Sequence, residues 1–208
     1  MRCCSWSKQA ELEFWVSEPE EQHIQRIRQK YELFSAERLI STYISRPRFT
    51  TYPTIIMDVG GGMFGGGLCF YHGRGQKILV DVLGEDYVKA GHLSSEVLVC
   101  TSDFDHIPFV SNTVAVIFAW EVLDHALTWE HFQQGQRELV RLLAPGGLLF
   151  FQLPLRPEGD NLHIPTSDEK EIMDGFAGLQ VIDEFENEVP GHTQWTGCVF
   201  TVMTKDKL

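Results

Sequence analysis

The chain has 208 residues, of which 43% are hydrophobic and 22% charged, and its formal net charge is -12. This length suits one domain with a buried core, and the composition excludes disordered and fibrous proteins. The negative charge disfavours a nucleic-acid surface, which normally shows a basic patch. No stretch approaches the roughly 20 apolar residues of a membrane-spanning helix, and the N-terminus lacks the apolar core of a signal peptide.

The cysteines indicate a reducing compartment. There are five, an odd number, and they are scattered without a Cys-x-x-Cys pair. We therefore expect free thiols in a cytoplasmic protein, with no zinc or other bound metal.

The first 50 residues are expected to form a helical N-terminal segment. A capping pattern that begins at Ser17 predicts a helix with one apolar face up to Phe34, and a second short helix is expected near residues 35–44. Two prolines then end the helical pattern. We divide the chain into an N-terminal appendage, residues 1–50, which packs on or lids the rest, and a main domain, residues 51–208.

The main domain alternates short apolar runs with helical segments. Five runs have the length and composition of buried strands, namely residues 54–59, 77–82, 96–100, 114–120 and 148–153. A glycine-rich stretch after the first run leads into a helix over residues 68–72, and residues 128–143 have the spacing of an amphipathic helix. This alternation predicts a parallel sheet with helices on both faces.

The end of the chain breaks the alternation. A helix over residues 167–176, opened by Thr166 and Glu169 as a capping box, precedes two strands over residues 179–185 and 195–204. A Pro-Gly turn between these strands makes them antiparallel, because a parallel return needs a crossover of about a dozen residues or more. The expected fold is a doubly wound, mostly parallel α/β sheet of seven strands with a reversed last strand.

The glycines after the first strand allow two kinds of ligand. Gly60, Gly62 and Gly65 satisfy G-x-G-x-x-G, and Asp81 lies 21 residues after Gly60, as in a dinucleotide site. Asp58 argues against that reading, because a carboxylate in this buried strand would repel a pyrophosphate. It suits a ligand that presents a cation, such as an ammonium group.

Five segments, in this order, resemble the motifs of the class I S-adenosylmethionine-dependent methyltransferases. They are DVGGG at 58–62, ILVDV at 78–82, TSDFDHIPF at 101–109, the fourth strand with its loop at 112–125, and ELVRLLAPGG at 138–147. The family's third glycine would fall at Phe64, which is a departure from the pattern. The resemblance covers about residues 54–154.

The resemblance implies S-adenosylmethionine as cofactor and S-adenosylhomocysteine as product. It places Asp58 near the methionine moiety, Asp81 on both ribose hydroxyls, Asp103 near the exocyclic amine of adenine and Phe104 beside the adenine ring. The complete implied cofactor set is Asp58, Gly60, Gly62, Asp81, Val82, Asp103, Phe104 and Trp120. The structural alternative for each aspartate is that it caps a turn at a strand end.

Catalysis can depend largely on alignment, because methyl transfer from a sulfonium is an in-line displacement. A base is needed only for a weakly acidic acceptor. His125 follows the fourth strand and is the candidate general base, although a loop histidine bonded to backbone is the structural alternative. Glu121 and Asp124 share its loop, and His163 and His192 lie in other loops at the same rim.

We expect an enzyme that methylates a small-molecule acceptor, without a nucleic-acid or membrane partner. Neither the acceptor nor the oligomeric state is fixed by the sequence. Two alternatives remain open. One is an NAD(P)-dependent oxidoreductase, based on the glycine fingerprint. The other is a non-catalytic scaffold that keeps the methyltransferase fold, favoured by Phe64 and by the lack of an obvious base.

Overall fold

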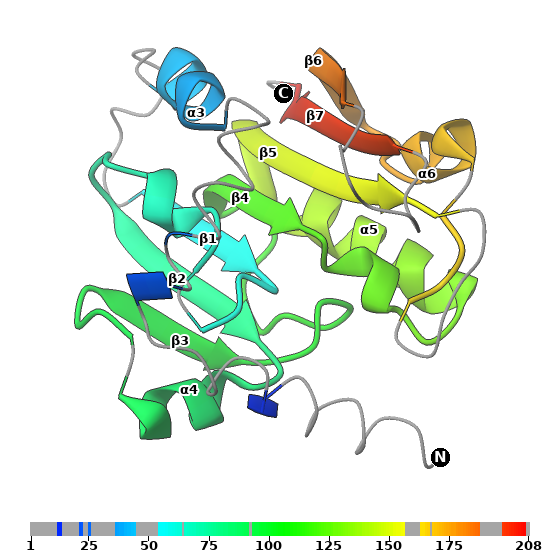
Figure 1. Ribbon diagram of the computed structural model, residues 1–208. Helices are drawn as coiled ribbons and strands as arrows, with labels where there is room; N and C mark the ends of the chain where they lie inside the picture. Colours follow the sequence, from blue (N-terminus) through cyan, green and yellow to red (C-terminus); the bar gives the residue numbers. More distant parts are fainter. Residues whose placement is uncertain are drawn as a thin grey trace.

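The protein is built on one seven-stranded sheet (Figure 1). The computed structural model describes residues 12–13, 21–22, 25, 36–44, 54–63, 65–91, 93–156, 163–166, 168–187 and 197–206. The strands are β1 (Ile55–Val59), β2 (Gln76–Asp81), β3 (Val97–Thr101), β4 (Val114–Trp120), β5 (Leu143–Leu155), β6 (Leu179–Asn187) and β7 (Gly197–Lys205). Their order across the sheet is β3-β2-β1-β4-β5-β7-β6.

The sheet is mostly parallel with one reversed strand, as predicted. Strands β1 to β5 pair in parallel with one another, whereas β7 pairs antiparallel with both β5 and β6. The chain moves outward from β1 to β3 and then crosses back to β4 on the other side of β1. In such sheets ligands bind outside the carboxyl ends of the strands, at the point where the order reverses. That point lies here between β1 and β4.

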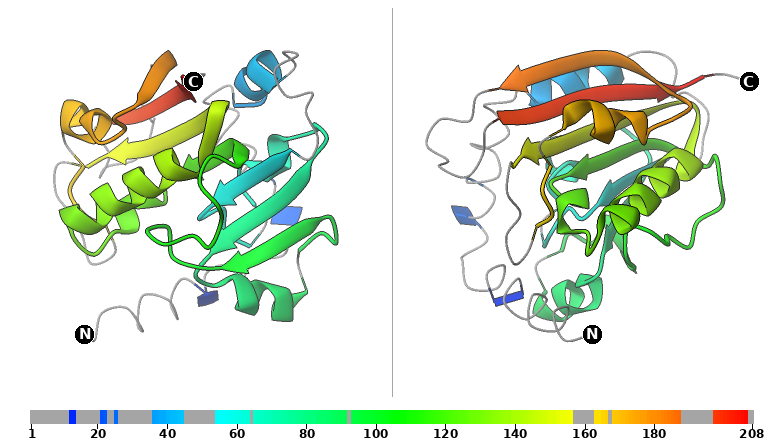
Figure 2. Two further views of the ribbon diagram at one scale, coloured as in Figure 1. Left: turned by 180° about the vertical axis from the view of Figure 1, so that it is seen from behind. Right: turned by 90° about the vertical axis from the view of Figure 1, so that its right-hand side faces the viewer.

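Helices cover both faces of the sheet (Figure 2). Helix α5 (Trp129–Leu142) packs on one face, and α3 (Ala36–Ile44) packs on the opposite face. The division follows from the alternation of side chains along β4: Ile117 and Ala119 join the cluster under α5, whereas Phe118 and Trp120 join the cluster under α3. Two shorter helices, α4 (Gly84–Ala90) and α6 (Glu169–Asp174), complete the layers.

Helix α3 confirms the short helix expected near residues 35–44. Its Ile40 and Tyr43 are buried against the sheet, and the Tyr43 hydroxyl donates a 2.6 Å hydrogen bond to Asp183. The helix predicted over residues 17–34 lies outside the described residues, except that Glu21, Gln22 and Gln25 are helical. The separation of residues 1–50 as an appendage stays a prediction.

One local prediction was wrong, one helix was missed, and one connection departs from the expected alternation of strands and helices. The helix expected over residues 68–72 is only a 3-10 turn, η2 (Leu68–Phe70), because glycines flank it on both sides and disfavour helix. Helix α4 was not predicted. Residues 102–113, all of them described, connect β3 to β4 without a helix.

The N-terminus of α6 was assigned to the wrong residue. The cap is Asp168, whose Oδ1 accepts a hydrogen bond from the Glu171 amide at 3.0 Å. Thr166 instead pairs with Arg156 in an isolated bridge and donates its hydroxyl to the Pro154 carbonyl. Separately, none of the helices in the described part of the chain has the length and apolar run that a membrane crossing requires.

Candidate active site

The predicted cofactor residues meet at one edge of the sheet. Asp58 is the second-last residue of β1, Asp81 ends β2, Asp103 follows β3 by two residues, and Trp120 ends β4. Because these strands are parallel, their carboxyl ends share an edge. The sequence motifs are therefore brought together, and the local environment of each residue decides what it can do there.

Asp58 is buried beneath the glycine loop, with a relative exposure of 1%. Its Oδ2 accepts hydrogen bonds from the backbone amides of Gly67 at 2.8 Å and Leu68 at 3.1 Å. Burial raises the pKa of the carboxyl from 3.8 to about 7; the two backbone hydrogen bonds lower it in part, and the nearby Asp81 raises it further. The sequence argument expected a cationic partner for Asp58, whereas the structure provides two backbone donors.

Asp81 is bound to the chain through both carboxylate oxygens. Oδ1 accepts from the Leu83 amide at 2.9 Å, and Oδ2 accepts from the Gly62 amide at 3.2 Å. These two bonds fix the orientation of the carboxylate at the end of β2. Val82, the next residue, is half-buried and packs against the cluster that contains Met63.

The glycine loop is packed closely against its neighbours. Gly60 has a positive φ of 67°, and a Cβ there would collide with the Val122 side chain. A Cβ on Gly61 would lie 2.6 Å from Asp58 Cγ, closer than real Cβ atoms approach. Glycine is thus required for the loop to close over Asp58. The departure at Phe64 lies outside the described residues.

Asp103 presents an accessible carboxylate at the end of β3. Its side chain is 46% exposed, and Oδ1 accepts a 2.8 Å hydrogen bond from the Phe104 amide. Phe104 is only 7% exposed, and its ring stacks on His131 with centroids 4.5 Å apart. Trp120 is 4% exposed and packs against Phe118 in the cluster under α3. A ligand at this edge could therefore reach much of Asp103 but only a small part of the two aromatic side chains.

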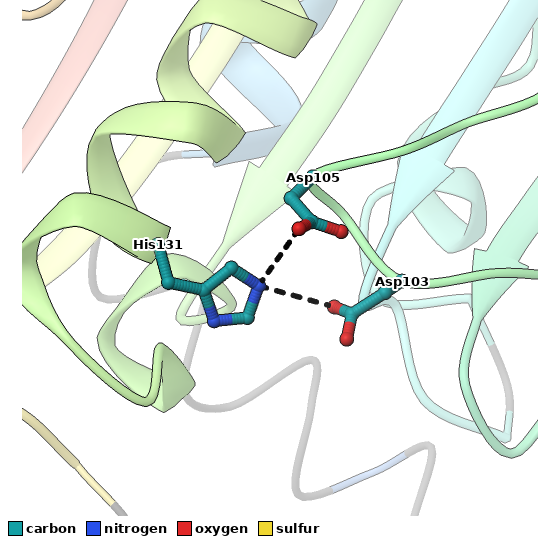
Figure 3. A group of neighbouring side chains, drawn as sticks. All are labelled: Asp103, Asp105 and His131. Atoms are coloured by element: carbon teal, nitrogen blue, oxygen red, sulfur yellow. Dashed lines mark ion pairs between the residues drawn. The ribbon is translucent and has the colours of Figure 1, made fainter.

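The structure adds His131 and Asp105 to this corner, which the sequence argument had missed (Figure 3). The imidazole Nε2 of His131 lies 3.4 Å from Asp105 Oδ2 and 3.9 Å from Asp103 Oδ1. Two carboxylates and an imidazole are also ligands that divalent metals use. However, Nδ1 accepts a hydrogen bond from the Leu127 amide at 3.1 Å, so in the neutral ring Nε2 carries the proton and has no lone pair for a metal.

A second group of polar residues lies after β4 and β5. The 3-10 turn η3 (Leu123–His125) follows β4, and the exposed ring of His125 packs against that of His163, with centroids 4.5 Å apart. The amide of Ile164 donates to the Asp124 carbonyl at 2.9 Å, which holds the two segments together. The structure therefore joins two of the predicted rim histidines. His192 lies outside the described residues.

The acidic residues of this rim are engaged within the protein. Asp124 is fully buried, with its Oδ2 3.5 Å from an Arg156 nitrogen. Glu121 has a positive φ of 50°, and its carboxylate accepts a 3.1 Å hydrogen bond from the Gln152 side chain. His125 is thus the accessible proton acceptor among the candidates of the β4 loop.

Comparisons with known proteins agree with this architecture. Residues 57–151 match the family described as a methyltransferase domain. A search of curated proteins returned no match to the chain. Among solved structures, the chain is similar to the N-methyltransferase NodS from Bradyrhizobium japonicum in complex with S-adenosylhomocysteine, at 13% identity, with 93% of this chain and 96% of that chain covered and a TM-score of 0.66.

Two further solved structures show how widely the fold is used. One is the 1,6-didemethyltoxoflavin-N1-methyltransferase from Burkholderia thailandensis with bound 1,6-didemethyltoxoflavin and S-adenosylhomocysteine: 12% identity, 90% and 87% coverage, TM-score 0.61. The other is the [4+2]-cyclase SpnF: 17% identity, 83% and 81% coverage, TM-score 0.57. At these identities the similarity demonstrates a shared fold.

Proposed function

We propose that the chain is a class I S-adenosylmethionine-dependent methyltransferase that transfers a methyl group from S-adenosylmethionine to a small-molecule acceptor, a proposal supported by the methyltransferase-domain match over residues 57–151 and by the shared fold. The observation that carries this proposal is the convergence of Asp58, Asp81 and Asp103 at the carboxyl edge of β1, β2 and β3. Three acids repel a pyrophosphate but can accept hydrogen bonds from hydroxyls and amines. The edge therefore favours a nucleoside without phosphates over a dinucleotide.

The residues fit the adenosine half of the cofactor. Asp81 is held by Leu83 and Gly62 in an orientation from which its oxygens can accept the ribose hydroxyls. Asp103 has an oxygen, Oδ2, that accepts no hydrogen bond within the described residues, and it can take the exocyclic amine of adenine. When bound, the cofactor supplies a methyl group activated by a sulfonium.

Asp58 was expected to lie near the methionine moiety of the cofactor, and we propose that it acts on that part of the site through the glycine loop. Its carboxylate ties down the amides of Gly67 and Leu68, and therefore fixes the loop that borders the methionine half of the site. In its ionised form the carboxylate favours a cation near the loop. Gly60 and Gly62 serve the same close packing, because a side chain on Gly60 would displace Val122.

His125 is the proposed general base. It is exposed at the end of η3, beside His163, and a neutral imidazole can take a proton from an acceptor hydroxyl or ammonium. Support for a small acceptor comes from the Burkholderia thailandensis enzyme, whose structure holds 1,6-didemethyltoxoflavin. The net charge of -12 disfavours nucleic acid as the acceptor. A cytoplasmic location stays a prediction.

Calorimetric titration with S-adenosylhomocysteine and with NAD tests the cofactor. We expect binding of the first and not the second, and preferential binding of NAD would overturn the proposal. Asp81→Ala should weaken S-adenosylhomocysteine binding about tenfold or more, because two ribose hydrogen bonds are lost at roughly 0.5 to 1.5 kcal/mol each. Asp86→Ala, at a partly exposed aspartate on α4, is the matched control, and thermal melting of both variants separates lost affinity from lost folding.

A second candidate is a non-methylating role on the same fold. The similarity to a [4+2]-cyclase favours keeping it, because fold alone does not fix the reaction. Incubation with S-adenosylmethionine labelled in the methyl group and a panel of small amines, phenols and carboxylates distinguishes the two. Label transfer to any acceptor supports methylation. Tight cofactor binding with no transfer to any member supports the second role.

A further inference from the structure

His131 lies where the loop after β3 meets the first turn of α5. Thr128 caps this helix by accepting a 3.1 Å hydrogen bond from the His131 amide, so the backbone at His131 is fixed. The side chain is 15% exposed. Its ring stacks on Phe104 at an interplanar angle of 23°. His131 is therefore a rigidly placed imidazole beside the segment proposed to recognise adenine.

The hydrogen bonding of the ring fixes its tautomer. Nδ1 accepts the Leu127 amide proton at 3.1 Å, which a protonated imidazolium could not do because both of its nitrogens are donors. The neutral ring therefore carries its proton on Nε2. Figure 3 shows that this nitrogen is the one turned toward Asp105 and Asp103.

The Nε2 proton faces two carboxylates that would otherwise repel each other. The contacting oxygens of Asp103 and Asp105 and the imidazole nitrogen all lie within 4.8 Å of one another. Asp103 is the most exposed of the three, and apart from the Phe104 amide, which donates to its Oδ1, the imidazole of His131 is a second group that can hold its side chain on this side of the loop. The imidazole dipole attracts both carboxylates and restricts Asp103 to the side of the loop that faces His131.

We propose that His131 is a positioning residue for the adenine subsite. It holds Asp103 so that Oδ2, which accepts no hydrogen bond within the described residues, is available to the exocyclic amine of adenine. This inference rests on the proposed function, since it presumes an adenosine-containing ligand. It assigns to α5 a part in selecting adenine, in addition to its packing on the sheet.

The two contacts of His131 can be separated by substitution. His131→Phe keeps an aromatic ring against Phe104 and removes both the Nε2 donor and the Nδ1 acceptor. His131→Gln loses the ring stack but places an amide donor within reach of the carboxylates. If His131 acts only by packing, the phenylalanine variant should resemble the wild type. If it acts through Asp103, the glutamine variant should.

The decisive measurement compares two ligands by calorimetry: S-adenosylhomocysteine and its analogue without the 6-amino group. The wild type should prefer the amino ligand. His131→Phe should reduce that preference about threefold to tenfold, the worth of roughly one net hydrogen bond, and His131→Gln should retain most of it. Asp103→Asn should lose the preference as well. His72→Phe, an exposed histidine before β2, is the control and should match the wild type.

Each outcome has one meaning. A wild type that binds neither ligand refutes the proposed function itself. A wild type that discriminates, with the same preference in a folded His131→Phe variant, refutes the positioning role and leaves the proposed function intact. A fall in the affinity of His131→Phe for both ligands by the same factor also refutes it, because that result shows no selective loss at the 6-amino group. Thermal melting of each variant establishes that it is folded.

Discussion

Asp58 makes the stability of the protein depend on pH in a direction opposite to that of most aspartates. Burial raises its pKa from 3.8 to about 7 in the folded chain, against two backbone hydrogen bonds that lower it. Between these values the folded state binds a proton that the unfolded state does not. The contribution of this carboxyl to stability is therefore greatest below pH 4 and is lost as the pH rises through 7.

The magnitude follows from the separation of the two pKa values. Over the two pH units from 5 to 7 stability falls by RT ln 10 per unit, so the wild type should lose roughly 3 kcal/mol between pH 5 and pH 8 through this group alone. Asp58→Asn removes the charge and keeps an oxygen that can accept from Gly67 and Leu68. The variant should lack this part of the pH dependence.

Urea unfolding of both proteins at pH 5 and pH 8 measures the effect. At each pH the free energy of unfolding of the wild type is subtracted from that of the variant, and the two differences are compared. Any constant cost of burying the new amide cancels in this comparison. We expect the variant to gain about 2 to 3 kcal/mol relative to the wild type at pH 8. The partly exposed Asp86→Asn serves as control. A relative stability that is the same within about 0.5 kcal/mol at both pH values would refute the reasoning.

Two other substitutions test the site. Gly61→Ala should destabilise the protein by about 1 to 3 kcal/mol and weaken S-adenosylhomocysteine binding. The new methyl would lie 2.6 Å from Asp58 Cγ and force the carboxylate off the loop amides. An unchanged melting temperature and an unchanged affinity would contradict the packing argument. His125→Ala should lower kcat by about 100-fold or more with an acceptor that must lose a proton, while cofactor affinity stays unchanged. A kcat within twofold of the wild type would exclude His125 as the base.

The sequence predicted the centre of the sheet well because strands β1, β4 and β5 are largely buried on both faces. Strand β4 was predicted with its observed bounds, Val114–Trp120, because an uninterrupted run of seven apolar residues indicates a buried strand. The reversed strand β7 followed from the short connection to β6. The helix predicted over residues 68–72 was wrong, because the glycine-rich stretch before it leads only into the 3-10 turn η2.

The partners of the site residues could not be predicted because they depend on contacts across the fold. The aspartates were recognised from their motifs, but the bond from Asp81 to the Gly62 amide joins residues 19 positions apart. His131 lies 28 positions after Asp103 on a helix whose spacing indicated only packing. Once α5 is docked on the sheet, the first turn of the helix necessarily meets the loop after β3. The signal available in the sequence was a histidine in the first turn of the predicted helix, together with the acidic segment that follows the third strand.

Asp58 is a buried ionisable residue in a strand that is otherwise apolar. Its two amide donors do not fully offset the desolvation of the charge, since its pKa remains near 7 instead of falling below 3.8. A chain that keeps such a residue either uses it in the neutral form or obtains further compensation from a ligand. A cation bound over the glycine loop would stabilise the carboxylate and lower its pKa again. Under the proposed function, the cationic partner that the sequence indicated would contact the whole loop, and Asp58 would act on it through the loop amides and, when ionised, through its charge.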